Sequence, residues 1–245
     1  MDTSVISEKG IRNTMEDAHF VDTDFGGRQW IFCGIYDGHG GQFASGYAAE
    51  NMHRVFLDNL LHGATPQQAF IDSYEKISAG LSEQTSGTTA VNIFIKNGII
   101  YTANAGDARA IVIGKNQVIQ LTIDHRVGNT EERQRIENSG GRIVYSYVSN
   151  GAGGLMPTRT IGDQPFKSVG VIATPSVGEH RISPDDSVLL IGCDGLFDVM
   201  SNEEIADFAS RTVNISSLLE NLKREVLVNR SGTDNLTIIA LKLNE

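Results

Sequence analysis

Short β-type runs recur along this chain, and their spacing limits the folds it can adopt more than any other feature. The runs are rich in Ile, Val, Tyr and Phe, and turn pairs such as Asn97-Gly98 separate them. Two such runs joined by a tight turn are typical of an antiparallel hairpin, so the sequence predicts antiparallel sheets. The expected strands cover residues 28–36, 88–96, 99–105, 109–113, 117–121, 187–193 and 235–243.

Helical periodicity is found in two pairs of segments, which are grouped in blocks rather than alternating with the strands one by one. This grouping predicts an α+β fold in one compact domain, with sheets packed on each other and helices outside. A shorter charged helix, residues 131–138, is expected inside the Gly-rich and otherwise irregular stretch 129–167. The two pairs cover residues 42–61 with 66–82 and residues 202–211 with 216–229.

Two of these helices begin with residues that are typical of N-terminal caps. Thr65 is a good N-cap, Pro66 suits the first helical position, and Gln68 has the spacing that closes a capping box. Ser201 and Glu204 have the spacing of a second capping box. We therefore expect helices to begin directly after Thr65 and Ser201.

The charge balance excludes several classes of protein. The 245 residues include 30 Asp and Glu against 20 Lys and Arg, a formal net charge of −10. The chain has no run of about 20 apolar residues and no signal-peptide pattern, which argues against a membrane-spanning or secreted protein. An acidic chain without a Lys/Arg cluster is a poor candidate for nucleic-acid binding.

Cys33 and Cys193 lie in apolar runs, so we expect buried free thiols and a reducing, cytosolic setting.

Acidic residues gather at the ends of the predicted strands. A single Asp at such a position is usually a turn residue, but several carboxylates on one rim repel one another unless cations neutralise them. Oxygen ligands suit Mg²⁺ or Mn²⁺, and the histidines lack the spacing of a zinc site. The sequence therefore predicts a multi-metal carboxylate site. The candidate ligands are Glu16, Asp17, Asp37, Asp107, Asp194, Asp198 and Asp234.

The loop Asp37-Gly-His-Gly-Gly41 is the most informative part of this pattern. Its glycines allow the backbone to approach an ion or a phosphate closely. His39 is either a polar turn residue or a general acid, since an imidazole with a pKa near ~6.5 can donate a proton at neutral pH. Arg12 is either a surface arginine or a phosphate ligand in fork geometry. The residues alone leave both alternatives open.

Nine motifs follow one another in order along nearly the whole chain. They are Arg12-Asn-Thr-Met-Glu-Asp-Ala-His19, Gly34-Ile-Tyr-Asp-Gly-His-Gly-Gly41, Ser86-Gly-Thr-Thr-Ala90, Ala103-Asn-Ala-Gly-Asp-Ala-Arg109, Leu121-Thr-Ile-Asp-His-Arg126, Glu132-Arg133 with Arg135-Ile136-Glu137 and Gly140-Gly141, Thr158-Arg159 with Gly162-Asp163, Cys193-Asp-Gly-Leu-Phe-Asp-Val-Met200, and Thr233-Asp234-Asn235. Together they resemble the metal-dependent protein serine/threonine phosphatases of type 2C, the PPM-type family, in its eukaryotic-like branch. One motif alone is a weak signal, whereas nine in register are specific.

The resemblance implies a central antiparallel β-sandwich flanked by two pairs of helices. Residues 1–245 would be a single phosphatase domain, with residues 129–167 as a flap subdomain. The implied reaction is hydrolysis of phosphoserine and phosphothreonine in phosphoproteins by a metal-bridged hydroxide at a binuclear Mg²⁺ or Mn²⁺ centre, without a covalent phosphoenzyme. We also expect a monomeric signalling enzyme of the cytoplasm, with nuclear access open, no nucleic-acid partner and no membrane insertion.

The resemblance also assigns roles to the acidic residues. Asp37 would bridge two Mg²⁺ or Mn²⁺ ions. Glu16 and the carbonyl group of Gly38 would bind one of these ions, and Asp194 and Asp234 would bind the other. Asp17 would act mainly through metal-bound water.

Three further roles follow from the same resemblance. A third, weaker ion would lie among Asp107, Asp194 and Asp198. Arg12 would bind the substrate phosphate, and His39 would protonate the leaving Ser or Thr oxygen.

Two features depart from the family pattern, and two other interpretations compete with it. Residues 151–159 are rich in glycine and include Pro157, which leaves peptide selectivity open. The only tryptophan is Trp30, so the flap lacks the Trp that some plant members use in partner recognition.

An inactive family member acting as a binding module is disfavoured because all seven carboxylates are present. A two-metal nuclease shares the ion chemistry but fits the acidic balance poorly. The motifs nearly fill the chain, so no regulatory extension is expected.

Overall fold

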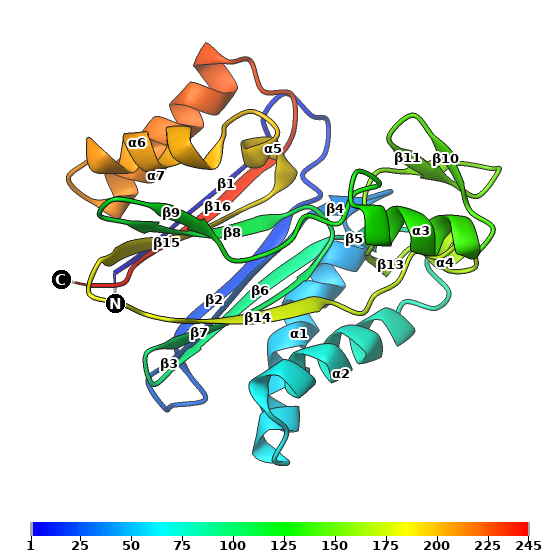
Figure 1. Cartoon of the computed structure of the whole chain (residues 1–245), viewed down its shortest axis with the longest axis horizontal. Coiled ribbons are helices and arrows are strands. Elements are labelled where there is room, and N and C mark those ends of the chain that lie inside the picture. The colour runs from blue at the N-terminus through cyan, green and yellow to red at the C-terminus, as the bar shows by residue number, and fades with distance from the viewer. Residues whose placement is uncertain (1, 245) are drawn as a thin grey trace.

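Two five-stranded antiparallel sheets pack face to face at the centre of the molecule (Figure 1). The computed structural model describes residues 2–244. The first sheet has the order β1 (Thr3–Glu8), β16 (Leu236–Lys242), β15 (Asp186–Gly192), β8 (Arg109–Gly114) and β9 (Val118–Gln120). The second sheet has the order β14 (Ser176–Arg181), β7 (Ile99–Ala105), β6 (Ala90–Lys96), β3 (Trp30–Tyr36) and β2 (Ala18–Phe25). The predicted β-sandwich is confirmed.

A pair of helices covers the outer face of each sheet (Figure 1). Helices α1 (Phe43–Leu61) and α2 (Pro66–Ala79) lie on the second sheet, and α6 (Asn202–Ser210) and α7 (Ile215–Arg224) lie on the first. Helix α7 continues into a π-helical turn, η1 (Glu225–Asn229). The four predicted helices are confirmed, with ends that differ by a few residues.

The helix starts follow the predicted caps with one exception. Thr65 Oγ1 accepts a hydrogen bond from the backbone N–H of Gln68 at 3.2 Å, and Ser201 and Glu204 form a reciprocal capping box. The Gln68 side chain does not return to Thr65; it donates to Asp72 Oδ1 at 2.8 Å. The prediction of a closed capping box at Gln68 was therefore wrong. The carboxylate four residues further along the same helix face is within reach of this side chain and competes for it.

Strand β3 shows how the core is divided between two layers. Cys33 and Ile35 face the other sheet, where aliphatic side chains predominate, and Phe32 packs in an aromatic layer with Phe56 of α1. Burial of one such phenylalanine side chain stabilises the fold by about 1.5–3 kcal/mol. Because both faces of β3 are buried, its sequence is a continuous apolar run rather than an alternating one. Cys33 and Cys193 are buried and free, as predicted.

The flap segment, residues 129–167, lies to one side of the sandwich (Figure 1). It contains α3 (Thr130–Asn138), which confirms the predicted charged helix, and the short helix α4 (Gln164–Lys167). The stretch expected to be irregular contains the short strands β10 (Arg142–Val144), β11 (Tyr147–Ser149) and β12 (Gly154–Leu155). Ile136, Val148 and Leu155 of this segment form a small core with Val171.

A small three-stranded sheet connects the end of the flap segment with the loop that follows β3. Its strands are β13 (Ile161–Gly162), β5 (Gly87–Thr88) and β4 (Gly38–His39), with β5 in the middle. Gly87 pairs with Gly162 on one side and with His39 on the other. The Asp37–Gly41 loop is therefore held in a sheet to which the flap segment contributes a strand.

Within the two large sheets, three strands lie outside the predicted ranges, namely β1, β2 and β14. Each forms an edge of one of the two large sheets. Among residues 2–244, no helix combines the length and the apolar character that crossing a membrane requires.

Candidate metal centre

Five of the predicted acidic residues lie near the point where a strand of the sandwich begins or ends. Asp37 follows β3, and Asp107 lies two residues beyond β7. Asp194 follows β15 closely and begins the short helix α5 (Asp194–Phe197). Asp17 directly precedes β2, and Asp234 lies two residues before β16. The sandwich thus supplies these side chains from five different segments.

The structure brings these side chains together. The carboxylate oxygens of Asp17 and Asp37 and the Sγ atom of Cys193 lie within 4.8 Å of one another. Asp37 lies near enough to Asp194 for the negative charge of Asp194 to repel its own. Asp107 and Asp234 are near enough to Asp194 to repel its negative charge. The prediction that these carboxylates converge agrees with this geometry.

Burial and mutual repulsion raise the pKa values in the cluster. Burial, together with repulsion from neighbouring carboxylates, raises the pKa of Asp17 to about 6 and that of Asp194 to about 7. Burial, followed by repulsion from Asp194, Asp17 and Asp107, raises the pKa of Asp37 well above its usual range. Like charges at this distance need bound protons or bound cations at neutral pH.

The donor atoms of the cluster fit a hard divalent cation. The Cys193 thiol lies beside the Asp17 carboxylate, but burial raises the pKa of this thiol, and only a thiolate binds metal well. Its Sγ atom accepts a hydrogen bond from the backbone N–H of Thr237 at 3.3 Å and donates to the carbonyl oxygen of Asn235 at 3.5 Å. Thr237 Oγ1 also donates to Asp17 Oδ2 at 2.7 Å. The remaining donors are oxygens, which Mg²⁺ and Mn²⁺ prefer.

Glu16 and Gly38 are packed against each other at the edge of the cluster. The Glu16 carboxylate accepts hydrogen bonds from Thr14 Oγ1 at 2.9 Å and from the Gly41 backbone N–H at 3.3 Å. A Cβ atom on Gly38 would lie 2.4 Å from the carbonyl oxygen of Glu16. Glycine is therefore required at position 38 for this close approach of two backbone segments.

Arg126 lies among the three carboxylates for which a third ion was predicted. Its Nε atom is 2.7 Å from Asp107 Oδ2, and its Nη2 atom is 2.8 Å from Asp198 Oδ1 and 3.9 Å from Asp194 Oδ2. No role for this arginine was predicted from the sequence. Since its guanidinium already neutralises part of this charge, a third ion would have to share these ligands with Arg126.

Arg12 lies at the rim of the cluster, beside Asp234. Its Nη2 atom is 2.6 Å from Asp234 Oδ2, and its Nε–H donates to the carbonyl oxygen of Thr233 at 3.1 Å. The Arg12 side chain is 55% exposed and the Asp234 side chain 37% exposed, so a ligand from solution can reach both.

His39 is bound to a residue of the flap segment. Its Nε2 atom is 2.7 Å from Oδ2 of Asp163. The Asp163 side chain is buried, whereas about a third of the His39 side chain is exposed. Asp163 lies in one of the sequence motifs, but its role could not be read from the sequence because 124 positions separate it from His39.

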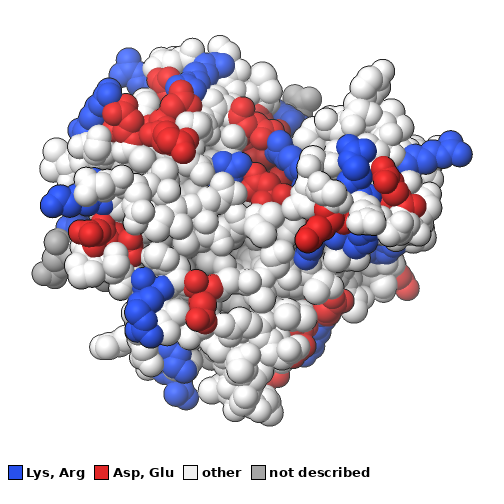
Figure 2. All heavy atoms as spheres, in the orientation of Figure 1, with Lys and Arg blue, Asp and Glu red and all other residues white. Residues whose placement is uncertain are grey.

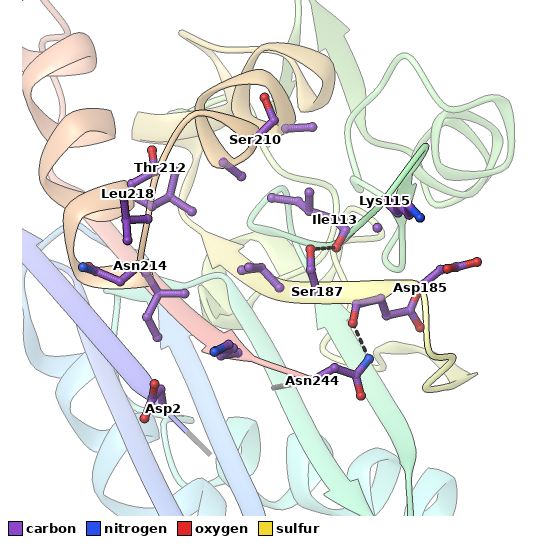
Figure 3. Close-up of a pocket in the computed structure, with 18 of the residues that line it drawn as sticks. Asp2, Ile113, Lys115, Asp185, Ser187, Ser210, Thr212, Asn214, Leu218 and Asn244 are labelled. Atoms are coloured by element: carbon purple, nitrogen blue, oxygen red, sulfur yellow. Dashed lines mark hydrogen bonds between the residues drawn. The ribbon is translucent and has the colours of Figure 1, made fainter.

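A pocket of about 500 Å³ lies elsewhere, between α6, α7 and the first residues of β15 (Figure 3). Ile113, Lys115, Asp185, Asn214 and Asn244 are among its lining residues. None of the predicted site residues lines this pocket. A shallower hollow of about 380 Å³ is lined by Asp17 and by residues of α1.

Similar sequences agree on one family. Residues 1–235 match the family described as Protein phosphatase 2C. The chain is 34% identical to Protein phosphatase 2C homolog 1 of Schizosaccharomyces pombe over 246 residues, which cover 95% of this chain and 70% of that protein. It is 30% identical to Protein phosphatase 1B of Homo sapiens, with 95% of this chain and 55% of that protein covered. The chain thus spans about half the length of the human protein.

Solved structures share the fold. The serine-threonine phosphatase 2C of Toxoplasma gondii matches with a TM-score of 0.85 at 22% identity, over 98% of this chain and 94% of that one. A sex determining protein of C. elegans matches with a TM-score of 0.88 at 22% identity, over 99% of this chain and 65% of that one. At this identity the likeness concerns the fold alone. The sequence matches carry the assignment further: the chain belongs to the protein phosphatase 2C family, whose members are metal-dependent protein phosphatases.

Proposed function

We propose that the chain hydrolyses phosphoserine and phosphothreonine in phosphoproteins at a centre of two Mg²⁺ or Mn²⁺ ions. The observation that carries this proposal is the proximity of carboxylates from separate strand ends, whose pKa values are raised by burial and by mutual repulsion. An arginine and a histidine at the rim of the same cluster add groups that can bind and protonate a phosphate ester. The flap segment, within a single domain, borders this cluster through Asp163 and His39.

The cluster offers ligands for two ions. Under this proposal Asp37 would hold both ions, Glu16 and the carbonyl group of Gly38 would help hold the first, and Asp194 and Asp234 would help hold the second. Asp17 would act through water, and a third, weaker ion would compete with Arg126 for Asp107, Asp194 and Asp198. When bound, the ions lower the pKa of a water molecule from ~15.7 toward neutrality and polarise the phosphoryl oxygens, so that no covalent phosphoenzyme is needed.

Two side chains act on the substrate directly. Arg12 binds the phosphate dianion, because its guanidinium is exposed and presents paired N–H donors in the fork geometry that phosphate accepts. A cation held by Asp234 would weaken the ion pair between this carboxylate and Arg12. His39 donates a proton to the leaving Ser or Thr oxygen, which is otherwise a poor leaving group.

The test is turnover of a phosphothreonine peptide with and without Mn²⁺. We expect activity that needs Mg²⁺ or Mn²⁺ and disappears with a chelator, and we expect Asp37→Asn to abolish both turnover and calorimetrically measured Mn²⁺ binding. Asp72→Asn removes an exposed carboxylate on α2 and is the matched control, with activity unchanged. Wild-type turnover in Asp37→Asn would overturn the metal assignment.

The competing interpretations have their own tests. A family member that binds metal tightly but turns over no phosphopeptide would be a binding module. A two-metal nuclease would nick plasmid DNA under the same conditions. On the face drawn in Figure 2, Lys and Arg side chains are interspersed with Asp and Glu, without a continuous basic surface that would bind phosphate backbones. The cytoplasmic location, the signalling role and the monomeric state stay predictions.

A further inference from the structure

We infer that Asp163 is a positioning residue for His39, and that through it the flap segment controls the proton donor of the reaction. The inference rests on the proposed function, in which His39 protonates the leaving oxygen. It adds a residue and a structural dependence to that reaction.

The contact determines which nitrogen of His39 is available to a substrate. The carboxylate of Asp163 accepts hydrogen bonds, so His39 Nε2 carries the hydrogen in their 2.7 Å contact. The proton for the leaving oxygen must then come from Nδ1, on the other side of the ring. Because the Asp163 side chain is only 3% exposed, water competes little for this carboxylate, and the ring is held in one orientation.

The backbone around Asp163 is built to hold its carboxylate in place. Asp163 has φ +53° and ψ +46°, a left-handed conformation that is uncommon outside glycine and persists only where the surroundings enforce it. Its backbone N–H donates to the carbonyl oxygen of Ser86 at 3.2 Å. A Cβ atom on Gly87 would lie 1.9 Å from Asp163 Oδ2. Glycine at position 87 therefore leaves the space that the carboxylate occupies.

Three short strands position Asp163 and His39 relative to each other. Gly87 of β5 is paired with His39 of β4 on one side and with Gly162 of β13 on the other, so Asp163 follows directly on the strand that flanks β5 (Figure 1). A further hydrogen bond holds the same end of the flap segment: Lys167 Nζ donates to the carbonyl oxygen of Thr160 at 2.6 Å. A displacement of this end of the flap segment would withdraw the carboxylate from His39.

The chemical step leaves Asp163 unchanged. A water oxygen forms the new bond to phosphorus and loses one proton to solvent. The bond between phosphorus and the Ser or Thr oxygen breaks, and its electron pair stays on that oxygen. The proton on Nδ1 of His39 moves to this oxygen, and the ring is left neutral with its Nε2–H still donating to Asp163. Solvent later returns a proton to Nδ1.

The experiment compares two substrates that differ in their need for a proton. We expect Asp163→Asn to lower kcat on a phosphothreonine peptide by about 10–100-fold, with KM little changed. Turnover of p-nitrophenyl phosphate, whose leaving group hardly needs protonation, should fall by less than about threefold. Asp163→Asn combined with His39→Ala should be no slower than His39→Ala alone, since both changes remove the same function.

The chain offers a matched control. Asp186 is a buried carboxylate whose Oδ2 lies 2.8 Å from Nε2 of His180, away from the cluster, so Asp186→Asn breaks the same kind of pair. This variant should leave the ratio of the two activities unchanged. Should Asp163→Asn fail to fold, Gly87→Ala displaces the carboxylate without removing it and is expected to give the same selective loss.

A spectroscopic measurement tests the contact without turnover. In Mg²⁺ buffer, the Nε2–H of His39 should give a low-field proton resonance that exchanges slowly with water and disappears in Asp163→Ala. Equal losses on both substrates in Asp163→Asn, or a resonance that survives in Asp163→Ala, would overturn the inference. Failure of the proposed function is distinguishable, because the wild type would then turn over neither substrate, or His39→Ala would slow both equally.

Discussion

Glu132 is a buried carboxylate that holds the base of the flap segment together. Arg135 donates to both of its oxygens at 2.6 Å, Arg159 Nη2 lies 2.7 Å away, and Thr158 Oγ1 donates at 2.6 Å. Burial alone would raise the pKa of Glu132, but the hydrogen bonds from Arg135, Arg159 and Thr158 outweigh it and lower the pKa to about 2. Charge and hydrogen bonds together fix α3 against the segment that carries Thr158 and Arg159.

This network predicts a defined pH dependence of stability. The pKa of Glu132 is lower in the folded state than its unfolded value of 4.5, so its contribution is complete above about pH 4.5 and is lost as the pH falls toward about 2. We expect Glu132→Gln to lower the free energy of unfolding by about 3 kcal/mol at neutral pH. Urea unfolding measured against pH should show this difference shrinking in acid.

Glu137→Gln, on the exposed side of the same helix, is the control and should change the free energy of unfolding by less than about 0.5 kcal/mol. A difference between wild type and Glu132→Gln that stayed constant down to about pH 2 would contradict an electrostatic role for Glu132.

The limits of prediction for single residues follow from what a sequence can show. Asp37 and Asp194 were found because each follows an apolar run, which is a local signal. Arg126 and Asp163 were missed as functional residues because their importance depends on partners that are distant in the sequence. That Cys193 lies close to the carboxylate cluster could have been predicted, since this residue directly precedes Asp194. Its apolar sequence neighbours favoured a packing role instead.

Among the elements, inner strands were predictable and most edge strands were not. Strands β3, β6 and β16 have neighbours on both sides and are buried on both faces, which produces apolar runs. Strands β1, β2 and β14 each have one neighbour in their sheet. In β14, half-buried and exposed residues alternate, and its polar sequence Ser-Val-Gly-Glu-His-Arg is hard to distinguish from a loop.

Helix caps give a prediction at the same scale. Ser201 and Glu204 form a reciprocal capping box at α6, whereas Thr65 caps α2 through its own side chain only. We therefore expect Ser201→Ala to lower the free energy of unfolding by about 1–1.5 kcal/mol and Thr65→Ala by about 0.5–1 kcal/mol. Chemical denaturation of both variants measures the difference. Gln68→Ala is the control, since this side chain bonds to Asp72 rather than to the cap; an effect as large as that of Ser201→Ala would contradict the assignment.

For the whole molecule, most of the net charge of −10 is concentrated at the proposed metal site, and little of it is on the remaining surface. Under the proposed function, seven of the 30 acidic residues belong to one metal site, and the rest of the chain has 23 acidic residues against 20 basic ones. The remaining surface is therefore close to neutral, and the excess of acid reflects the cluster. Two divalent ions would bring four positive charges to the place where the repulsion is concentrated.

Removal of metal should therefore destabilise the entire fold, and more so at higher pH. In the metal-free protein the folded pKa values of Asp17 and Asp194, about 6 and about 7, exceed the unfolded value of 3.8, so stability falls as the pH rises through this range. Bound Mg²⁺ replaces these protons. At saturating Mg²⁺ we expect Tm to rise by about 5–10 °C at about pH 8 and by clearly less at about pH 5. Thermal unfolding with Mg²⁺ and with chelator measures both rises. Asp37→Asn should reduce them, and equal rises at the two pH values would mean that the cations do not bind at these carboxylates.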